Sequence, residues 1–176
     1  GSGSACKELD RSQLRAGHPE GRMAEPFATG VIKGDEVTRT WNVYLSGEIH
    51  SDWREQIESM TAEVGLPVAY SSPVTDREAS DDCGAKILGG EANPVWHDRK
   101  GAQINAIRTR TLIEDADVIV VRFGEKFRQW NAAFDAGFAA ALGKPLIILH
   151  LEEHRHALKE VDAAALAVAE TPEQVF

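Results

Sequence analysis

The chain has 176 residues, which is the length of one domain, and its apolar content of 43% and charged content of 27% are ordinary for a globular protein. Its 28 acidic and 19 basic residues give a net charge of −9, which disfavours a nucleic-acid polymer or an anionic membrane as a partner. No apolar run reaches the ~20 residues of a membrane span and no secretory signal is recognisable, so we expect a cytoplasmic protein.

Residues 1–40 differ from the rest of the chain, because Gly, Pro and charged residues recur there without a helical or strand period. The opening Gly-Ser-Gly-Ser resembles an expression-vector remnant, and Met23 is a candidate native start. We therefore predict a vector-derived or flexible segment over 1–40 and a folded domain over 41–176.

The folded region is predicted to begin with a strand over 41–46, in which apolar and polar residues alternate before Gly47. A helix follows over 53–64, with Asp52 as its N-cap. A second strand is predicted over 66–70. The inward face of the helix is predicted to carry Trp53, Ile57, Met60 and Val64.

A long polar stretch occupies residues 71–97, and stretches of this length in compact domains are often functional. The alternative is a solvent-exposed surface loop, with or without a short helix. A long helix is then predicted over 98–115. Its common face is predicted to carry Ile104, Ile107, Thr111 and Leu112.

Two continuous apolar runs, at 118–121 and 146–149, are typical of parallel strands that are covered on both faces. An alanine-rich helix is predicted between them, over 129–142, and Gly143-Lys144-Pro145 is its stop signal. The remaining predicted elements are a short helix over 158–164, a strand over 166–168 and a capping-box helix start at 171–174.

Five strands that alternate with helices predict an α/β fold, a doubly wound (flavodoxin- or Rossmann-like) parallel five-stranded sheet with helices on both faces. Ligands of such sheets bind beyond the carboxyl ends of the strands. This rule selects the segments that follow strands, namely 47–51, 71–76, 122–129 and the residues from 150 onward.

The first candidate site follows the first strand. Gly47 permits a close approach of backbone at the edge of the sheet, and the next helix offers free N–H groups to an anion. Glu48 comes directly after this glycine and is a candidate acid or base. The chain has no GxGxxG and no Walker A lysine, which argues against a dinucleotide or triphosphate cradle.

The second candidate is Asp135, which lies inside a very apolar helix between Phe134 and small residues. A carboxylate there costs desolvation free energy unless it has partners or a task. The alternative is a structural aspartate that is satisfied by hydrogen bonds.

Two motifs resemble the nucleoside 2-deoxyribosyltransferase family. They are Ala116-Asp117-Val118-Ile119-Val120-Val121 and Asp135-Ala136-Gly137-Phe138-Ala139-Ala140-Ala141-Leu142-Gly143-Lys144-Pro145. A third segment, Tyr44-Leu45-Ser46-Gly47, is similar to the first strand and turn of that family. The chain resembles the YtoQ family more closely still, and this likeness covers most of residues 41–175. The matching segments are 44–50, 105–111 and 122–144.

The resemblance implies that the acid before x-Gly attacks C1′ of a deoxyribose and forms a glycosyl-enzyme intermediate. Asp135 stands at that position, where the family usually has Glu, and its side chain is one methylene shorter. Two further family acids are replaced by Gln129, which cannot be a general acid, and by Thr109. The resemblance also implies a homo-oligomer, a dimer or higher.

Other residues in the selected segments are candidates for binding the substrate. Tyr44 and Trp130 offer rings that stack on a base or sugar, and Arg122 ends a strand where a phosphate ligand is expected, with Lys126 nearby. The remaining candidates are Ser46, Gly47, Ile49, His50, Asp76, Asn105, Arg108, Gly124, Glu125, Gln129 and Asn131.

Metal binding has little support in the sequence. The cysteines Cys6 and Cys83 show no metal-ligand spacing, which indicates free thiols. His150, His154 and His156 lie close together, but no acid or cysteine completes a known motif. We predict no metal and no cofactor.

Three interpretations follow. The leading one is an enzyme that acts on the N-glycosidic bond of a nucleoside or nucleotide, by hydrolysis or base exchange, with Asp135 as nucleophile or oxocarbenium stabiliser and Glu48 as helper. The second is a non-catalytic nucleotide-binding module that keeps the pocket. The third is a hydrolase of small carbohydrate or phosphate substrates that uses Glu48 and Asp76.

Overall fold

The computed structural model describes residues 39–126 and 129–175. The chain divides into two compact units, and all described residues belong to the second, Val37–Phe176. The prediction for residues 1–40 therefore falls almost wholly outside the described residues, as does Cys6. Within the described part of the chain, no helix is long and apolar enough to cross a bilayer.

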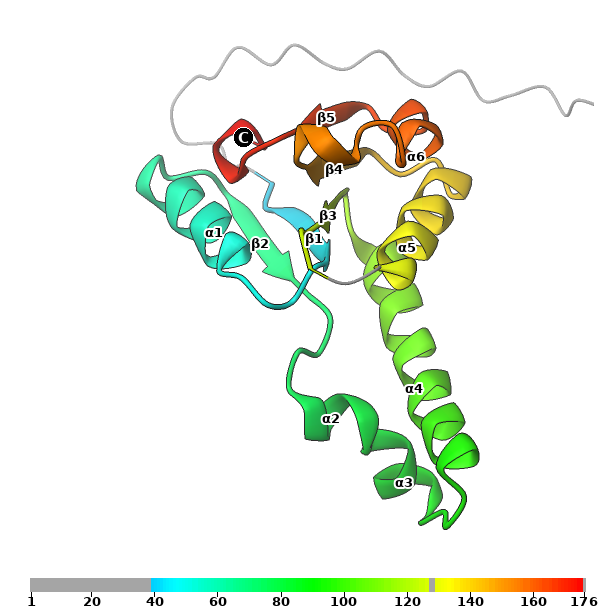
Figure 1. The fold of residues 1–176 in the computed structure, drawn as a ribbon. Coiled ribbons are helices and arrows are strands. Elements are labelled where there is room, and N and C mark those ends of the chain that lie inside the picture. Colours follow the sequence, from blue (N-terminus) through cyan, green and yellow to red (C-terminus); the bar gives the residue numbers. More distant parts are fainter. Residues whose placement is uncertain (1–38, 127–128, 176) are drawn as a thin grey trace, which may run out of the picture. The chain divides into compact units, whose positions relative to one another are not determined.

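A five-stranded sheet forms the centre of this unit (Figure 1). Every pair of neighbouring strands is parallel, which confirms the predicted α/β doubly wound architecture. The spatial order is β2-β1-β3-β4-β5, so the chain reverses its direction of winding between β1 and β3. The strands are β1 (Trp41–Gly47), β2 (Val68–Ser71), β3 (Val118–Phe123), β4 (Leu146–His150) and β5 (Ala167–Ala169).

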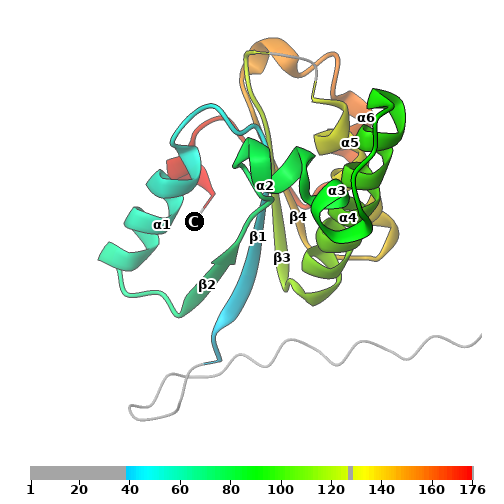
Figure 2. The same cartoon turned by 90° about the horizontal axis from the view of Figure 1, so that it is seen from below.

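Helices cover both faces of the sheet, as Figure 2 shows with the sheet seen nearly edge-on. On one face, α1 (Trp53–Glu63) packs against Leu45, Val120 and Leu149, and the short 3-10 helix η3 (Pro172–Gln174) contacts α1. On the other, α4 (Pro94–Asp115) and α5 (Trp130–Ala141) pack against the opposite side chains of the same strands. The last elements are η2 (Glu152–His154) and α6 (Lys159–Ala163).

The polar stretch 71–97 is helical over much of its length. It contains α2 (Arg77–Asp81) and α3 (Cys83–Leu88), and α4 begins at Pro94 rather than at 98. Asn93 caps α4, because its side chain accepts a hydrogen bond from the N–H of Val95. Cys83 is a buried free thiol.

The predicted inward face of α4 is correct only in part, because Leu112 packs against the core whereas Ile107 and Thr111 are exposed. Ile107 is 65% exposed, whereas Ile113, which was not on the predicted face, is fully buried. The reason is that the N-terminal part of α4 packs against α2 and α3, while only its last turns meet the sheet (Figure 1). The side of α4 that contacts the sheet is therefore the side that carries Ile113. In α1, Trp53 and Ile57 are buried as predicted, but Val64 is exposed.

Helix ends are stabilised by specific side chains. Lys144 Nζ donates to the carbonyl oxygens of Glu114 at 2.5 Å and Ala116 at 2.9 Å, so this motif residue satisfies the last carbonyls of α4. The predicted capping box of Thr171 and Gln174 is present. Asp52 occupies the N-cap position of α1, but its carboxylate accepts from Gln56 instead of from the backbone.

Candidate active site

The ends of β1 and β3 approach each other very closely. Gly47 is paired with Arg122 and has φ +100°, and a Cβ atom on Gly47 would lie 2.1 Å from the carbonyl oxygen of Arg122. The N–H of Glu48 donates to the same carbonyl at 3.0 Å. Only glycine fits this position. The contact also fixes the position of Glu48 at the end of the sheet, which is the edge where ligands of doubly wound sheets bind.

Asp135 lies on the buried side of α5 and is 7% exposed. Its Oδ2 atom accepts a hydrogen bond of 2.5 Å from Ser46 Oγ at the end of β1. Among the described residues this is the hydrogen bond that holds the carboxylate. Burial raises the pKa of Asp135, and the Ser46 hydroxyl offsets part of the rise.

Tyr44 points to the same side of β1 as Ser46 and is fully buried. Burial, together with the charge of Asp135, raises the pKa of Tyr44 to about 12. The nearby hydroxyls of Thr109 and Ser46 and the charge of Arg54 lower this pKa, but by less than the other two causes raise it. Its phenol oxygen has no hydrogen bond of standard geometry within the described residues. Tyr44 is therefore a neutral proton donor at physiological pH, and it lies close to Asp135.

Glu48 is 5% exposed and is held from several sides. Its two carboxylate oxygens accept hydrogen bonds from the N–H of His50 and from Ser51 Oγ, and Arg122 Nε lies 3.8 Å from Oε2. Burial alone would raise the pKa of Glu48, but these donors and the charge of Arg122 lower it below its ordinary value. Glu48 is thus ionised at neutral pH.

The loop after β3 closes over Glu48. A Cβ atom on Gly124 would lie 2.3 Å from Glu48 Cγ, so the loop backbone touches this side chain. Gln129 Oε1 accepts from the N–H of Gly124 at 2.8 Å, and its Nε2 donates to the carbonyl of Lys126 at 3.0 Å. The amide of Gln129 therefore fixes the loop with both of its polar groups.

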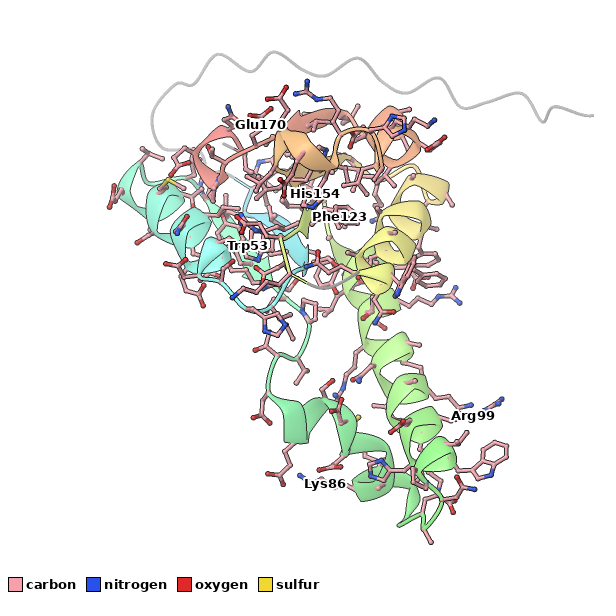
Figure 3. All side chains as sticks on the ribbon, in the orientation of Figure 1. Trp53, Lys86, Arg99, Phe123, His154 and Glu170 are labelled. Carbon is pink, nitrogen blue, oxygen red and sulfur yellow. The ribbon has the colours of Figure 1, made fainter. Side chains whose placement is uncertain are left out.

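Sequence reasoning missed two residues that shape the site. Arg54 Nε donates to the backbone carbonyl of Leu45 at 3.1 Å, and its two terminal nitrogens donate to the backbone carbonyls of Glu48 at 2.6 Å and Gly47 at 3.3 Å. Trp53, labelled in Figure 3, donates from Nε1 to the carbonyl of Glu48 at 2.9 Å. One signal was available, because a cation in the first turn of a helix opposes the helix dipole and so indicates another partner.

We expect Arg54→Met to lower the free energy of unfolding by about 3 kcal/mol, since the carbonyl groups of Leu45, Gly47 and Glu48 each lose a hydrogen bond from the guanidinium. Trp53 remains as a donor to the carbonyl of Glu48. For a domain of this size the fall in Tm is roughly 10 °C. Arg99→Met, which removes an exposed guanidinium from α4, is the matched control and should change Tm by less than about 2 °C. Equal Tm values for the two variants in a thermal melt would contradict the role of Arg54.

The structure brings about half of the predicted site residues to this edge of the sheet and distributes the others around it. The first group lies between β1, β3 and α5 and consists of Tyr44, Ser46, Gly47, Glu48, Arg122, Gly124, Gln129 and Asp135. A second group is exposed and consists of Ile49, His50, Glu125, Trp130 and Asn131.

Three predicted residues bind other parts of the chain. Asp76 is the N-cap of α2, where its side chain accepts from the N–H of Ala79. Asn105 Nδ2 donates to the carbonyl of Ser80 at 3.0 Å, and Arg108 donates to the carbonyl of Ala79 at 3.1 Å. Asn105 and Arg108 thus attach α2 to α4.

Asp76 also lines a cavity of about 520 Å³ together with Glu78, Asp81, Asp82, His97 and Asp98, none of which belongs to the first group.

His150 is buried at the end of β4 and uses both ring nitrogens within the fold. Nδ1 lies 2.7 Å from the carbonyl oxygen of Leu151, and Nε2 lies 3.1 Å from a carboxylate oxygen of Asp162 in α6. Within the described residues, no group of three or more His, Cys, Asp or Glu side chains is arranged to hold a metal ion. His150, the last residue of β4, therefore anchors α6 through Asp162.

Comparisons of the sequence with known proteins point to one family. A family model described as nucleoside 2-deoxyribosyltransferase YtoQ matches residues 44–176. The uncharacterized protein YtoQ of Bacillus subtilis (strain 168) is 45% identical over 134 residues, which are 76% of this chain and 90% of that protein.

Two solved structures are similar at low sequence identity. A conserved protein from Enterococcus faecalis V583 has a TM-score of 0.52 at 12% identity, over 78% of this chain and 95% of that one. A 2-deoxyribosyltransferase from Bacillus psychrosaccharolyticus has a TM-score of 0.47 at 15% identity, over 76% of this chain and 89% of that one. The first of these likenesses supports the fold.

Proposed function

Because the chain belongs to the family of nucleoside 2-deoxyribosyltransferase YtoQ, we propose that it cleaves the N-glycosidic bond of a nucleoside or nucleotide. The carboxylate of Asp135 acts at C1′ of the sugar. The observation that carries this proposal is that a nearly buried carboxylate in an otherwise apolar helix is held by a hydroxyl at the carboxyl edge of the sheet.

The proposed reaction uses the ionised form of Asp135. Its carboxylate attacks C1′ while the bond to the base breaks and the base leaves with the bonding electrons. Water, or a second base, then takes the sugar from the ester, which gives hydrolysis or base exchange. Ser46 holds the attacking group, and the neutral phenol of Tyr44 supplies a donor beside it.

Glu48 enters this proposal as an anion. Its lowered pKa makes it a poor proton donor at neutral pH, so it does not protonate the leaving base. It instead holds Arg122 at the edge of the sheet, where a guanidinium suits a carboxylate or phosphate of the substrate. The substrate class is a small nucleoside or nucleotide, and no cofactor takes part.

A second candidate function is a nucleotide-binding module without catalysis. It is favoured by Gln129, whose amide is committed to the backbone of Gly124 and Lys126, and by Glu48, whose oxygens are already hydrogen-bonded. Neither side chain is then available to protonate a leaving base.

A panel of nucleosides and nucleoside 5′-monophosphates separates the two functions. We expect the protein to release free base from at least one member of the panel, measured by liquid chromatography and mass spectrometry. A rise of Tm with a nucleotide but no base release over the panel would support the binding module and overturn the enzymatic proposal.

The pH dependence of base release should report on the bond between Ser46 and Asp135. Activity should fall as the pH falls through the raised pKa of Asp135, because the protonated carboxyl cannot attack. Ser46→Ala removes a hydrogen bond that lowers this pKa, so the acid limb of the pH profile should move to higher pH. The rate on the plateau should also fall ~10-fold, because Ser46 no longer positions the carboxylate of Asp135. Ser51→Ala, which removes a donor to Glu48, is the control and should leave the acid limb in place. Identical acid limbs for Ser46→Ala and wild type would contradict the assignment.

A further inference from the structure

Cleavage at the N-glycosidic bond needs a proton donor for the leaving base. A base that departs as an anion is a poor leaving group, and a positioned acid speeds such steps by ~10²–10⁴-fold. Glu48 is ionised at neutral pH, and the amide of Gln129 is bonded to the loop after β3. The phenol of Tyr44 has a pKa of about 12, so it is a weak acid. The donor must therefore be another residue at this edge of the sheet.

The loop after β1 is placed to supply that donor. The winding of the chain reverses between β1 and β3, so α1 follows β1 on one face of the sheet and α5 follows β3 on the other face (Figure 2). Ligands of doubly wound sheets bind at such a switch point, beyond the carboxyl ends of the strands. A ligand there has Asp135 on the side of α5 and the loop after β1 on the side of α1.

The same loop gives His50 a fixed place. The carboxylate of Glu48 turns back on its own loop and accepts hydrogen bonds from the N–H of His50 and from Ser51 Oγ. Trp53 and Arg54, in the first turn of α1, donate to the carbonyl of Glu48. His50 is exposed, and the charge of its ring is close enough to lower the pKa of Glu48. The histidine therefore lies beside the switch point on a loop that is held from within.

We propose that His50 is the proton donor to the leaving base, an inference that rests on the proposed cleavage of the N-glycosidic bond. Histidine is the residue type that gains and loses a proton near neutral pH, and it is the commonest general acid. The other described histidines lie elsewhere. His150 uses both ring nitrogens within the fold, and His154 and His156 follow β4, one strand further from the switch point. His97 lies in α4, 3.2 Å from Asp82.

Protons and electrons balance over two steps. As the carboxylate of Asp135 bonds to C1′, the bond from C1′ to the base nitrogen breaks and its electron pair stays on the base. The imidazolium of His50 gives its proton to the base, and both leave this step neutral. When water attacks C1′ of the ester, His50 takes a proton from the water and Asp135 departs as a carboxylate. Both groups are then restored.

Two leaving groups of different basicity test the assignment. A purine or pyrimidine needs a proton in order to leave, whereas para-nitrophenolate departs without one. The substrates are the panel nucleoside that wild type cleaves and the para-nitrophenyl glycoside of the same sugar, both under single-turnover conditions. His50→Gln should slow the release of base at least ~100-fold and the release of para-nitrophenol less than ~3-fold. His156→Gln, at an exposed histidine after η2, is the matched control and should change neither rate.

The fold should tolerate His50→Gln, because the hydrogen bond to Glu48 comes from the backbone of residue 50. A thermal melt should show a change in Tm of less than about 2 °C. Equal slowing of both substrates, or slowing of neither, would overturn the role of His50 and leave the proposed cleavage in place. Asp135→Asn should slow both substrates, since both need the nucleophile. A wild type that cleaves neither substrate would overturn the proposed cleavage itself, and the role of His50 with it.

Discussion

Asp135→Asn is expected to reduce base release by about 10³-fold or more while the fold remains intact, because the substitution removes the negative charge that attacks C1′. The asparagine amide has nearly the same shape and keeps an oxygen that accepts from Ser46. Base release is measured under single-turnover conditions, so that slow product release does not mask the chemical step. A variant that retains more than about a tenth of the wild-type rate would contradict the role of Asp135.

The same substitution should raise the free energy of unfolding at neutral pH. The pKa of Asp135 is raised in the folded protein, so the native state binds a proton more tightly than the unfolded chain does. The stability that this group contributes therefore increases as the pH falls through its folded pKa, and above that pKa the buried charge costs stability. An uncharged asparagine escapes this cost, so its Tm should exceed that of wild type at pH 7 and the difference should shrink on acidification. A lower Tm at pH 7 would indicate that Asp135 is a structural residue.

Gly47→Ala is expected to lower the free energy of unfolding by about 4 kcal/mol or more, or to prevent folding. The alanine methyl group would lie 2.1 Å from the Arg122 carbonyl oxygen, and the atom in its way belongs to the backbone of the central strand β3, which cannot yield cheaply. The loss is measured by urea unfolding.

Gly65→Ala is the matched control for this effect. Gly65 has φ +69°, but no atom lies within 4 Å of the position that its Cβ would take. The variant should therefore show only the cost of a left-handed backbone, about 1–2 kcal/mol. Equal losses of unfolding free energy in Gly47→Ala and Gly65→Ala would mean that the close approach of β1 and β3 does not make Gly47 a special position.

The strands β3 and β4 were predictable because their apolar residues follow each other without a break. The runs at 118–121 and 146–149 correspond to β3 and β4, and parallel pairing follows from the helices between them. In α4 the same kind of reasoning failed. Ile107 has the spacing of a core residue but is exposed, because the partners of the N-terminal part of α4 are α2 and α3, which periodicity alone cannot reveal.

At the candidate site, the sequence indicated which residues lie near the edge of the sheet but not how they are used. Glu48 and Asp135 both follow from position and composition, and both are buried there. Whether a carboxylate is satisfied depends on its neighbours in space. Ser51 and Arg122 hold Glu48, whereas Asp135 has Ser46, which lies 89 positions away in the chain.

Asn105 and Arg108 show the converse difficulty. They were chosen for the polar groups that they carry, and the structure uses those groups to attach α2. A polar side chain on a helix has the same sequence signature whether it binds a ligand or a neighbouring helix. Their prediction as substrate-binding residues has no support from their contacts.

The proposed function requires the carboxylate of Asp135 to face the sugar of a bound substrate. A crystal structure of Asp135→Asn with a nucleoside 5′-monophosphate would show this contact, since the variant binds without turnover. We expect C1′ of the sugar to lie ~3–3.5 Å from the side chain at position 135, with the ligand above Gly47. A nucleotide bound elsewhere, such as in the cavity beside Asp76 and His97, would exclude Asp135 as the group that acts on the sugar.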